Sequence, residues 1–272
     1  MKYKLLVLDV DGTIITELSR ISDHVKNAVR EVQKKGILVT LTTGRMFRTT
    51  LPFVHDLNIT LPVICYQGAL IKNPLNKELI FHEPIPLDLA QKVVDVAKKE
   101  KVHLNFYIND TLYMTHPKSP EAKEYLKIEK QNRNTEQNYI NLENYKLKKS
   151  PTKFIIISDK THINKVEKYI QKEFKDELST TRGIRDFLDI LNIGISKGKA
   201  LKILADYLGV KKKEIISIGD YYNDIPMFTE SGLSIAVKNS PTKVKKAVDY
   251  VTDSVENDGA AKAIEKFILK NH

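Results

Sequence analysis

The sequence predicts an α/β protein: a doubly wound core with a parallel sheet, interrupted by an inserted α+β domain. In the first and last thirds of the chain, short apolar strands alternate with helices, which is typical of a parallel sheet. In the middle third, paired strands lie among helices, which favours an antiparallel sheet. We expect residues 1–83 and 191–272 to form the core and residues 84–190 to form the insert. The 272 residues are enough for two domains of modest size.

The elements of the core follow from apolar patterning and capping residues. Ser22 is a typical helix N-cap and Gly36 a typical residue after a helix end, with Val25 and Val29 at helical spacing between them. Apolar runs predict buried strands over residues 3–9, 37–41, 62–66, 214–218 and 233–236. Further helices are predicted over residues 46–57, 198–208, 223–230, 241–247 and 259–270.

The insert begins near Pro84 and follows a different pattern. Asn109 and Asp110 separate two short apolar runs, which predicts a hairpin. Strands are predicted over residues 103–108, 111–115, 153–158, 179–182 and 186–191, and helices over 88–100, 119–133 and 161–175. The Asn- and Lys-rich residues 134–149 are predicted to be loop.

Composition argues against several classes of protein. Lys and Arg number 44 against 34 Asp and Glu, a net charge of +10. The basic residues are spread along the chain rather than gathered in a tail, which argues against nucleic-acid binding. The single cysteine, Cys65, excludes a disulfide framework. Because no apolar run reaches the roughly 18 residues of a membrane span and the N-terminus lacks a signal-peptide pattern, we expect a cytoplasmic protein that binds no membrane.

Polar residues follow three of the predicted parallel strands, and a lysine opens a predicted helix. The carboxyl ends of parallel strands form the usual ligand site of open α/β sheets, so we expect these residues to gather there. The candidate site residues are Asp9, Asp11, Thr43, Gly44, Lys197, Asp220, Asn223 and Asp224.

The residue types in this set suit a metal ion and an anion. Asp9 and Asp11 face the same way along an extended chain, and adjacent carboxylates repel unless a cation or a proton intervenes. Together with Asp220 they would suit Mg²⁺. Gly44 lets backbone N–H groups approach an anion, and Lys197 can neutralise charge on a transferred group. A calcium loop is the alternative for Asp-x-Asp-Gly alone, but the chain does not continue with the further oxygen ligands of such a loop.

Four motifs together resemble those of the haloacid dehalogenase-like superfamily. They are Asp9-x-Asp11-Gly12-Thr13, Thr43-Gly44-Arg45, Lys197-Gly198 and Gly219-Asp220-x-x-Asn223-Asp224. The position of the insert, the run Ala236-Val237-x-Asn239 and the later Asp258-Gly259-Ala260 are similar to the Cof-type phosphatases. The resemblance spans almost the whole chain. It implies a Rossmann-like core, a cap domain and a Mg²⁺-dependent phosphatase.

The resemblance also implies a role for each motif residue. Asp9 would be the nucleophile that forms an aspartyl-phosphate, and Asp11 would be the general acid and base. Mg²⁺ would be held by Asp9, the backbone carbonyl of Asp11 and Asp220, with Asp224 acting through a water. Phosphoryl oxygens would be bound by the N–H groups of Val10 and Gly44 and by the side chains of Thr43, Lys197 and Asn223.

The implied substrate is a small phosphorylated metabolite, with sugar phosphates first and pyridoxal phosphate or flavin mononucleotide as alternatives. Candidate specificity residues are Arg45, Gln67, Arg182, Arg185 and Asp189. A surface salt-bridge set is the competing interpretation of the last three. Gln67 stands where the family often has Asn, which affects substrate detail. We expect no nucleic-acid partner and a monomer or weak homodimer.

Other functions remain open at this stage. A phosphomutase or phosphotransferase of the same superfamily would share the core motifs and would need a second sugar-phosphate site in the cap. A phospho-acceptor switch like a response-regulator receiver also phosphorylates an aspartate after a strand, but the large insert and Asp11 argue against it. Nucleic-acid binding is the weakest alternative.

Overall fold

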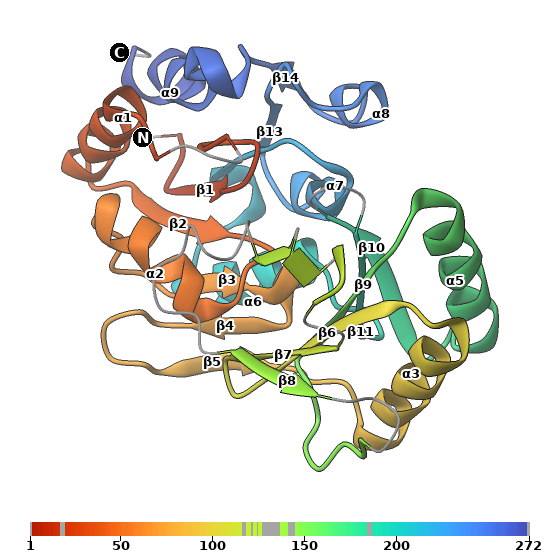
Figure 1. Ribbon diagram of the computed structural model, residues 1–272. Coiled ribbons are helices and arrows are strands. Elements are labelled where there is room, and N and C mark those ends of the chain that lie inside the picture. Colours follow the sequence, from red (N-terminus) through yellow and green to blue (C-terminus); the bar gives the residue numbers. More distant parts are fainter. Residues whose placement is uncertain are drawn as a thin grey trace. The chain divides into compact units, whose positions relative to one another are not determined.

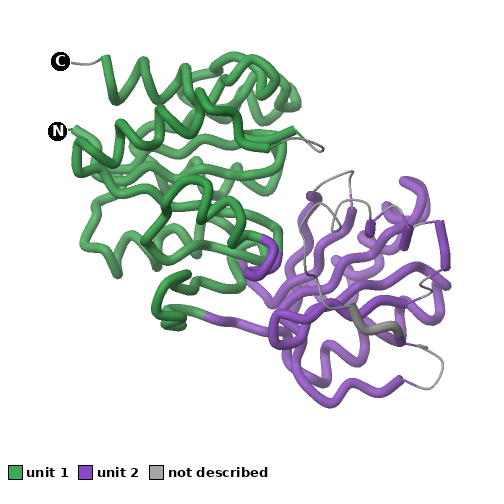
Figure 2. Tube along the Cα trace, turned by 60° about the vertical axis from the view of Figure 1, so that its left-hand side comes forward, with its two compact units in different colours: residues 1–45, 50–81, 196–272 green, residues 46–49, 82–195 purple. Residues whose placement is uncertain are grey.

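The computed structural model describes residues 2–16, 20–115, 118–120, 122–123, 125–126, 137–140, 145–183 and 187–270. The chain divides into two compact units, which Figure 2 colours separately. Unit 1 contains Met1–Arg45, Thr50–Phe81 and Ser196–His272, and unit 2 contains Met46–Thr49 and His82–Ile195. The roles of these parts as a catalytic core and a cap remain predictions.

Unit 1 is built on a sheet with the strand order β14-β13-β12-β1-β2-β3-β4-β5 (Figure 1). Its strands are β1 (Leu5–Asp9), β2 (Leu38–Thr42), β3 (Val63–Cys65), β4 (Leu70–Lys72), β5 (Leu79–His82), β12 (Ile215–Gly219), β13 (Leu233–Ala236) and β14 (Tyr250–Val251). The pairs from β14 to β3 are all parallel, and β4 then pairs with β3 in the antiparallel direction. The predicted α/β fold with a parallel-sheet core is confirmed.

The register brings three strand ends to one edge of this sheet. Asp9, the last residue of β1, pairs with Thr42 of β2. On its other side, β1 pairs with β12 so that Leu8 lies beside Ile218. Because the three strands run in the same direction, the residues that follow them emerge together.

Helices cover both faces of the sheet (Figure 1). Helix α1 (Asp23–Lys34) begins at Ser22, whose hydroxyl accepts the Val25 N–H, and it contacts β2 and α9. On the opposite face, Leu5 and Val7 of β1 pack with apolar residues of α6, α7 and α8. The helices of unit 1 are α1, α2 (Phe47–Asp56, whose first residues belong to unit 2), α6 (Lys197–Leu208), α7 (Ile225–Phe228), α8 (Thr242–Lys245) and α9 (Gly259–Ile264), which continues as a π-helical turn over Glu265–Leu269.

Unit 2 has its own sheet, with the order β10-β11-β9-β6-β7-β8. Its elements are α3 (Leu87–Glu100), β6 (His103–Ile108), β7 (Thr111–Thr115), β8 (Gln137–Ile140), β9 (Lys153–Ile157), α5 (Lys160–Glu173), β10 (Leu178–Arg182) and β11 (Leu188–Asn192). Apolar residues of α3 and α5 pack on one face of this sheet, around Phe106 and Phe154. Among the residues of unit 2 that the structure describes, the strand pairs are antiparallel except β7–β8.

The structure corrects the element prediction at several places. Part of the predicted loop at 134–149 is strand β8, because the free edge of β7 offers backbone hydrogen bonds that the polar composition does not reveal. Strands β4, β5 and β14 were not predicted, and the helix expected over 223–230 is a 3₁₀ turn at Tyr222–Asp224 followed by the short α7. The helix predicted over 119–133 falls largely outside the described residues.

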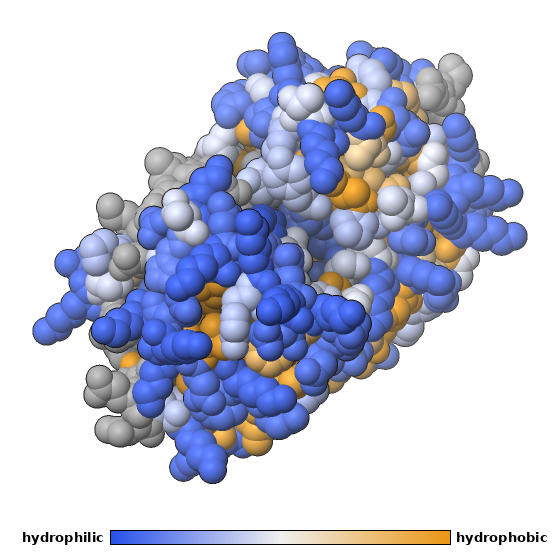
Figure 3. Space-filling view, turned by 90° about the vertical axis from the view of Figure 1, so that its right-hand side faces the viewer, coloured by the Kyte–Doolittle hydropathy of each residue, from blue (hydrophilic) through white to orange (hydrophobic). Residues whose placement is uncertain are grey.

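The surface seen in Figure 3 carries mainly hydrophilic side chains, with apolar ones in small groups. In the part of the chain that the structure describes, no helix is both long and apolar enough to cross a membrane.

Candidate active site

Asp9 lies at the centre of a buried polar cluster at the carboxyl end of β1. The residue is only 3% exposed. Its Oδ1 accepts a hydrogen bond of 2.6 Å from Lys197 Nζ, and its Oδ2 accepts one of 3.0 Å from the Thr13 hydroxyl. Both carboxylate oxygens of Asp9 are thus held in place, one by the nearby Thr13 and one by Lys197, which is distant in the sequence.

Lys197 joins Asp9 to a second carboxylate. Its Nζ also donates to Asp224 Oδ1 at 2.6 Å, and the lysine side chain is fully buried. The other oxygen of Asp224 accepts the backbone N–H groups of Asp220 and Tyr221, at 2.9 and 3.0 Å. Asp224 therefore fixes both the lysine and the turn that carries Asp220.

Asp220 approaches the same cluster from the end of β12. The Thr13 hydroxyl lies 3.3 Å from its Oδ1. A Cβ atom on Gly12 would lie 2.3 Å from Asp220 Oδ2, and Gly12 has a φ of +81°. Only glycine fits this position, because a side chain would collide with the carboxylate and would strain the backbone.

Asp11 is turned toward Arg45. The guanidinium binds both carboxylate oxygens of Asp11, Nη2 with Oδ1 and Nε with Oδ2, the latter at 2.7 Å. Arg45 is 8% exposed and its guanidinium lies 5.0 Å from the Phe53 ring centre. The structure thus gives Arg45, predicted as a specificity residue, a direct contact with the predicted acid and base.

The predicted anion-binding residues lie around the end of β2. Thr43 is fully buried, and its hydroxyl accepts the Arg45 N–H at 3.1 Å. A Cβ on Gly44 would lie 2.5 Å from Gln67 Nε2, and Gln67 Oε1 accepts a hydrogen bond of 2.8 Å from Asn223. Val10, which follows Asp9, is completely buried.

Burial and charge shift the proton affinities within the cluster. Burial raises the pKa of Asp9 to about 7, because Lys197 offsets only part of the cost of an enclosed charge and Asp224 and Asp11 add repulsion. Burial and the neighbouring Asp9 and Asp224 also raise the pKa of Asp220. For Lys197, burial opposes the charge, but Asp224 and Asp9 outweigh it and raise its pKa.

The spacing and the charge of the carboxylates in this cluster suit a divalent cation. Carboxylate oxygens of Asp9, Asp220 and Asp224 all lie within 4.8 Å of one another. Lys197 supplies one positive charge against these three carboxylates, and the pKa values of Asp9 and Asp220 are raised by burial first, with repulsion between the carboxylates adding to the rise. Oxygen ligands of this kind suit Mg²⁺. The cluster therefore fits the predicted ion, with Asp224 already engaged by Lys197 and two backbone N–H groups.

Thr13 is not among the candidate site residues named from the sequence, although its hydroxyl bridges Asp9 and Asp220. Its place in Asp9-x-Asp11-Gly12-Thr13, directly after the turn glycine, is the signal that could have identified it.

The predicted specificity residues in unit 2 have structural partners of their own. Arg182 contacts Glu167 and Asn164 of α5, with Nε 3.1 Å from the Glu167 carboxylate. Asp189 is buried and pairs with Lys153 at 3.0 Å. Arg185 lies outside the described residues. The salt-bridge interpretation thus accounts for the contacts seen at Arg182.

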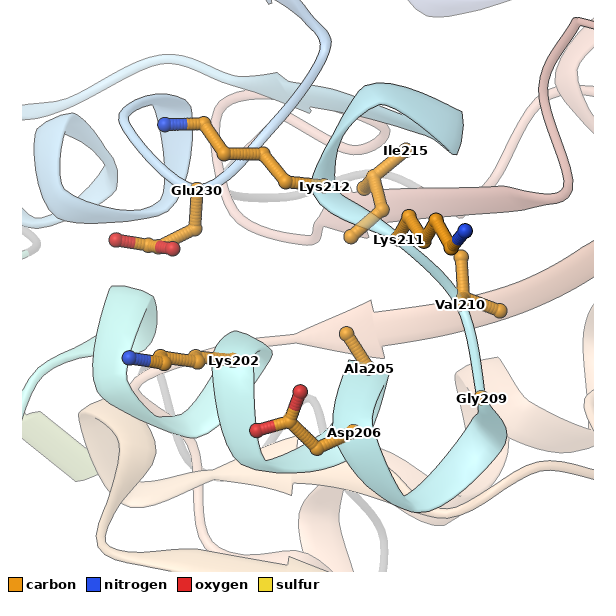
Figure 4. A pocket seen from close by; sticks show the side chains of 9 residues that line it. All are labelled: Lys202, Ala205, Asp206, Gly209, Val210, Lys211, Lys212, Ile215 and Glu230. Carbon is orange, nitrogen blue, oxygen red and sulfur yellow. The ribbon is translucent and has the colours of Figure 1, made fainter.

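A hollow of about 450 Å³ in unit 1 contains none of the predicted site residues. Figure 4 shows that it lies between α6 and the segment leading into β12, with Lys202 and Asp206 on the helix side and Lys212 and Glu230 opposite. One of its lining residues, Ile215, is the first residue of β12, whereas Asp220 follows the carboxyl end of that strand.

Comparison with known proteins agrees with this fold and motif set. The family model for haloacid dehalogenase-like hydrolases matches residues 6–264. A putative phosphatase of Bacillus subtilis, YxeH, is 26% identical over 98% of this chain and 99% of its own length. The 5-amino-6-(5-phospho-D-ribitylamino)uracil phosphatase YcsE of the same organism is 28% identical over 98% of this chain and 96% of its own.

A solved structure shows the same architecture. A haloacid dehalogenase-like hydrolase from Bacteroides thetaiotaomicron superposes with a TM-score of 0.86 and 27% identity, covering 98% of this chain and 100% of its own. The parallel strands, with acidic residues gathered at their carboxyl ends, define the class as an α/β protein built on an open, mostly parallel sheet. The chain belongs to the haloacid dehalogenase-like hydrolase family. The predicted family and enzyme class are confirmed.

Proposed function

We propose that the protein is a Mg²⁺-dependent phosphatase that hydrolyses phosphomonoesters of small metabolites, sugar phosphates first. The observation that supports this most is the carboxylate of Asp9, which Lys197 and Thr13 hold at the end of β1 beside Asp220. A held, buried carboxylate next to a cation site is suited to attack an electrophilic phosphorus, since charge neutralisation and positioning provide most of phosphoryl-transfer catalysis.

The reaction proceeds in two steps on this chain's residues. In the first, an Asp9 oxygen attacks phosphorus, the bond to the leaving oxygen breaks, and Asp11 gives that oxygen a proton. In the second, Asp11 takes a proton from a water that attacks the aspartyl-phosphate, and phosphate leaves with Asp9 restored. Mg²⁺, held by Asp9, the Asp11 carbonyl and Asp220, would supply charge neutralisation. Thr43, Lys197 and Asn223, with the N–H groups of Val10 and Gly44, bind the phosphoryl oxygens.

Arg45 sets a condition on the first step. It occupies both oxygens of Asp11, so proton delivery to the leaving group requires one of those oxygens to be released. We propose that Arg45 binds a polar group of the substrate in exchange.

The proposed substrate class draws on the relatives as well. The name of the Bacillus subtilis enzyme YcsE describes a phosphate carried on a ribityl group, which is a phosphorylated polyol chain. Cytoplasmic location and a monomer or weak homodimer are part of the same proposal.

Release of inorganic phosphate from a panel of phosphorylated metabolites, with Mg²⁺ and with excess chelator, tests this function. We expect turnover with Mg²⁺ and none with chelator or in Asp9→Asn. Steady turnover by Asp9→Asn would contradict the proposal. Transfer to a second sugar phosphate in place of water would favour the phosphotransferase alternative.

A further inference from the structure

Three consecutive residues after β3 have left-handed backbone conformations. Tyr66, Gln67 and Gly68 have φ values of +52°, +59° and +105°. For Tyr66 and Gln67 this conformation is unfavourable, since both carry side chains. The three residues are also buried. Such strain persists only where the surroundings impose it, and it is concentrated at functional sites.

The segment Tyr66–Gly68 contacts two separate parts of the candidate site through its backbone. The N–H groups of Tyr66 and Gln67 donate to the carbonyls of Arg45 and Thr43, at 2.9 and 3.1 Å. Gly68 lies so close to the start of α6 that an added Cβ would be 2.3 Å from Ser196 O and 3.1 Å from Lys197 N. The strained backbone thus joins the end of β2 to the residue before Lys197.

The side chain of Gln67 adds a third connection. Its amide lies against Gly44, where an added Cβ would meet Nε2 at 2.5 Å, and its Oε1 accepts the Asn223 amide at 2.8 Å. Gln67 is 3% exposed. It therefore lies between two residues to which the proposed function assigns phosphoryl binding.

The hydrogen bond with Gln67 determines how the amide of Asn223 is oriented. With one amide N–H directed at Gln67, the Asn223 Oδ1 is buried and has no hydrogen-bond partner. Oxygen and nitrogen of an amide are assigned from their surroundings. If both amides are turned by a half-rotation, Gln67 donates to Asn223 and the same bond is kept. The buried unpartnered atom of Asn223 then becomes an N–H donor, which is what a phosphoryl oxygen requires.

We propose that Gln67 is a positioning residue of the phosphate site: it fixes the amide of Asn223 so that one N–H group is presented to the bound phosphoryl group. This inference rests on the proposed function. It gives Gln67 a role toward the phosphate, whereas the sequence analysis placed it among the candidate specificity residues.

The test compares Gln67→Met, which keeps the length and removes both hydrogen-bonding atoms, with Gln67→Glu, which can only accept. Binding of inorganic phosphate in the presence of Mg²⁺ is measured by calorimetry, and KM and kcat are measured with p-nitrophenyl phosphate. We expect Gln67→Met to weaken phosphate binding and raise KM about tenfold, with a smaller change in kcat. Gln67→Glu is expected to weaken binding further, because it makes Asn223 donate to it and adds negative charge.

Gln33→Met is the matched control, because the Gln33 amide likewise makes hydrogen bonds, donating to the backbone carbonyls of Leu57 and Asn58, but it belongs to helix α1, away from the candidate site. It should leave phosphate binding unchanged. A double-mutant cycle with Asn223→Ala should show that the effects of Gln67→Met and Asn223→Ala on phosphate binding are not additive.

Two results would overturn the inference: Gln67 variants that bind phosphate as the wild type does while only their melting temperature falls, or fully additive effects in the cycle. If the wild-type protein itself binds no phosphate with Mg²⁺ present, the proposed function fails first, so the two failures are distinguishable.

Discussion

Lys197 and Asp9 lie 188 positions apart in the sequence, yet Lys197 Nζ donates a 2.6 Å hydrogen bond to Asp9 Oδ1. The lysine is fully buried and binds Asp224 at the same distance. This buried cation therefore joins the last residue of β1 to the turn that follows β12. We expect its loss to affect both the proposed chemistry and the stability of the fold.

Lys197→Met should remove activity and lower the free energy of unfolding by roughly 3–5 kcal/mol, because it leaves buried carboxylates without their partner. Urea denaturation measures the loss. Adding Asp224→Asn to Lys197→Met should restore part of the stability, since one of the uncompensated charges is then removed. A double variant no more stable than Lys197→Met would argue against the ion-pair explanation.

Gly12→Ala should destabilise the protein and weaken its response to Mg²⁺. The substitution adds a Cβ 2.3 Å from Asp220 Oδ2 at a φ of +81°. Gly36→Ala is the matched control, because Gly36 has a φ of +76° but nothing within 4 Å of an added Cβ. Both variants should lose about 1 kcal/mol to backbone strain, and only Gly12→Ala should lose the thermal shift that Mg²⁺ produces. Equal Mg²⁺ responses in the two would contradict the contact with Asp220.

The sequence predicts which site residues the strand topology brings together, but it does not predict which partner each side chain contacts. Asp9 and Asp220 were expected together because parallel strands end at a common edge, and the register of β1 with β12 places them there. The orientation of Asp11 toward Arg45 was not predictable in the same way, since spacing along an extended chain says which face a side chain leaves from and not which partner it finds.

In the fold, too, elements with local sequence signals were predictable and elements that depend on distant pairing were not. Long apolar runs such as β1 and the capped helix α1 were predicted because their signals are local. Strand β8 depends on its pairing with β7, and short β4 depends on its antiparallel partner β3. Such pairings are decided by tertiary context, which overrides local propensity. The left-handed Gln67 belongs with them, because its conformation is imposed by contacts with Thr43 and Gly44.

Mg²⁺ should stabilise the protein more at about pH 8 than at about pH 5. The pKa of Asp9 rises from 3.8 to about 7 on folding, so the folded metal-free protein binds protons more tightly than the unfolded chain. Its stability therefore falls as pH rises from about 4 through about 7. A cation that binds the ionised carboxylates opposes this loss. Thermal unfolding with and without Mg²⁺ at the two pH values measures the effect, and Asp220→Asn should reduce it. A Mg²⁺ shift independent of pH would count against the carboxylate cluster as the ion's site.

His24 should make a pH-dependent contribution to stability away from the active site. Its hydrogen bond with Glu265 raises the pKa of His24 above 6.5, burial opposes this, and Asp258 adds to the rise. His24 thus joins α1 to both ends of α9, to Asp258 before its first residue and to Glu265 after its last. Because the folded-state pKa is raised, the stabilisation is fully present below pH 6.5 and is lost as pH rises through the folded-state pKa.

The difference in melting temperature between the wild-type protein and His24→Gln should therefore be larger at about pH 5.5 than at about pH 9. A difference that grows with pH would show that the charged form of His24 is not what stabilises this contact.

Transfer of the phosphoryl group to Asp9 is the most direct test of the proposed chemistry. An Asp11→Asn variant lacks the proposed general base, so it should accumulate the aspartyl-phosphate when it is mixed with acetyl phosphate and Mg²⁺. Peptide mass spectrometry after rapid acid quench should locate one phosphoryl group on Asp9, and none in Asp9→Asn. Phosphate release by wild type with label on another residue, or on no residue, would contradict a nucleophilic Asp9.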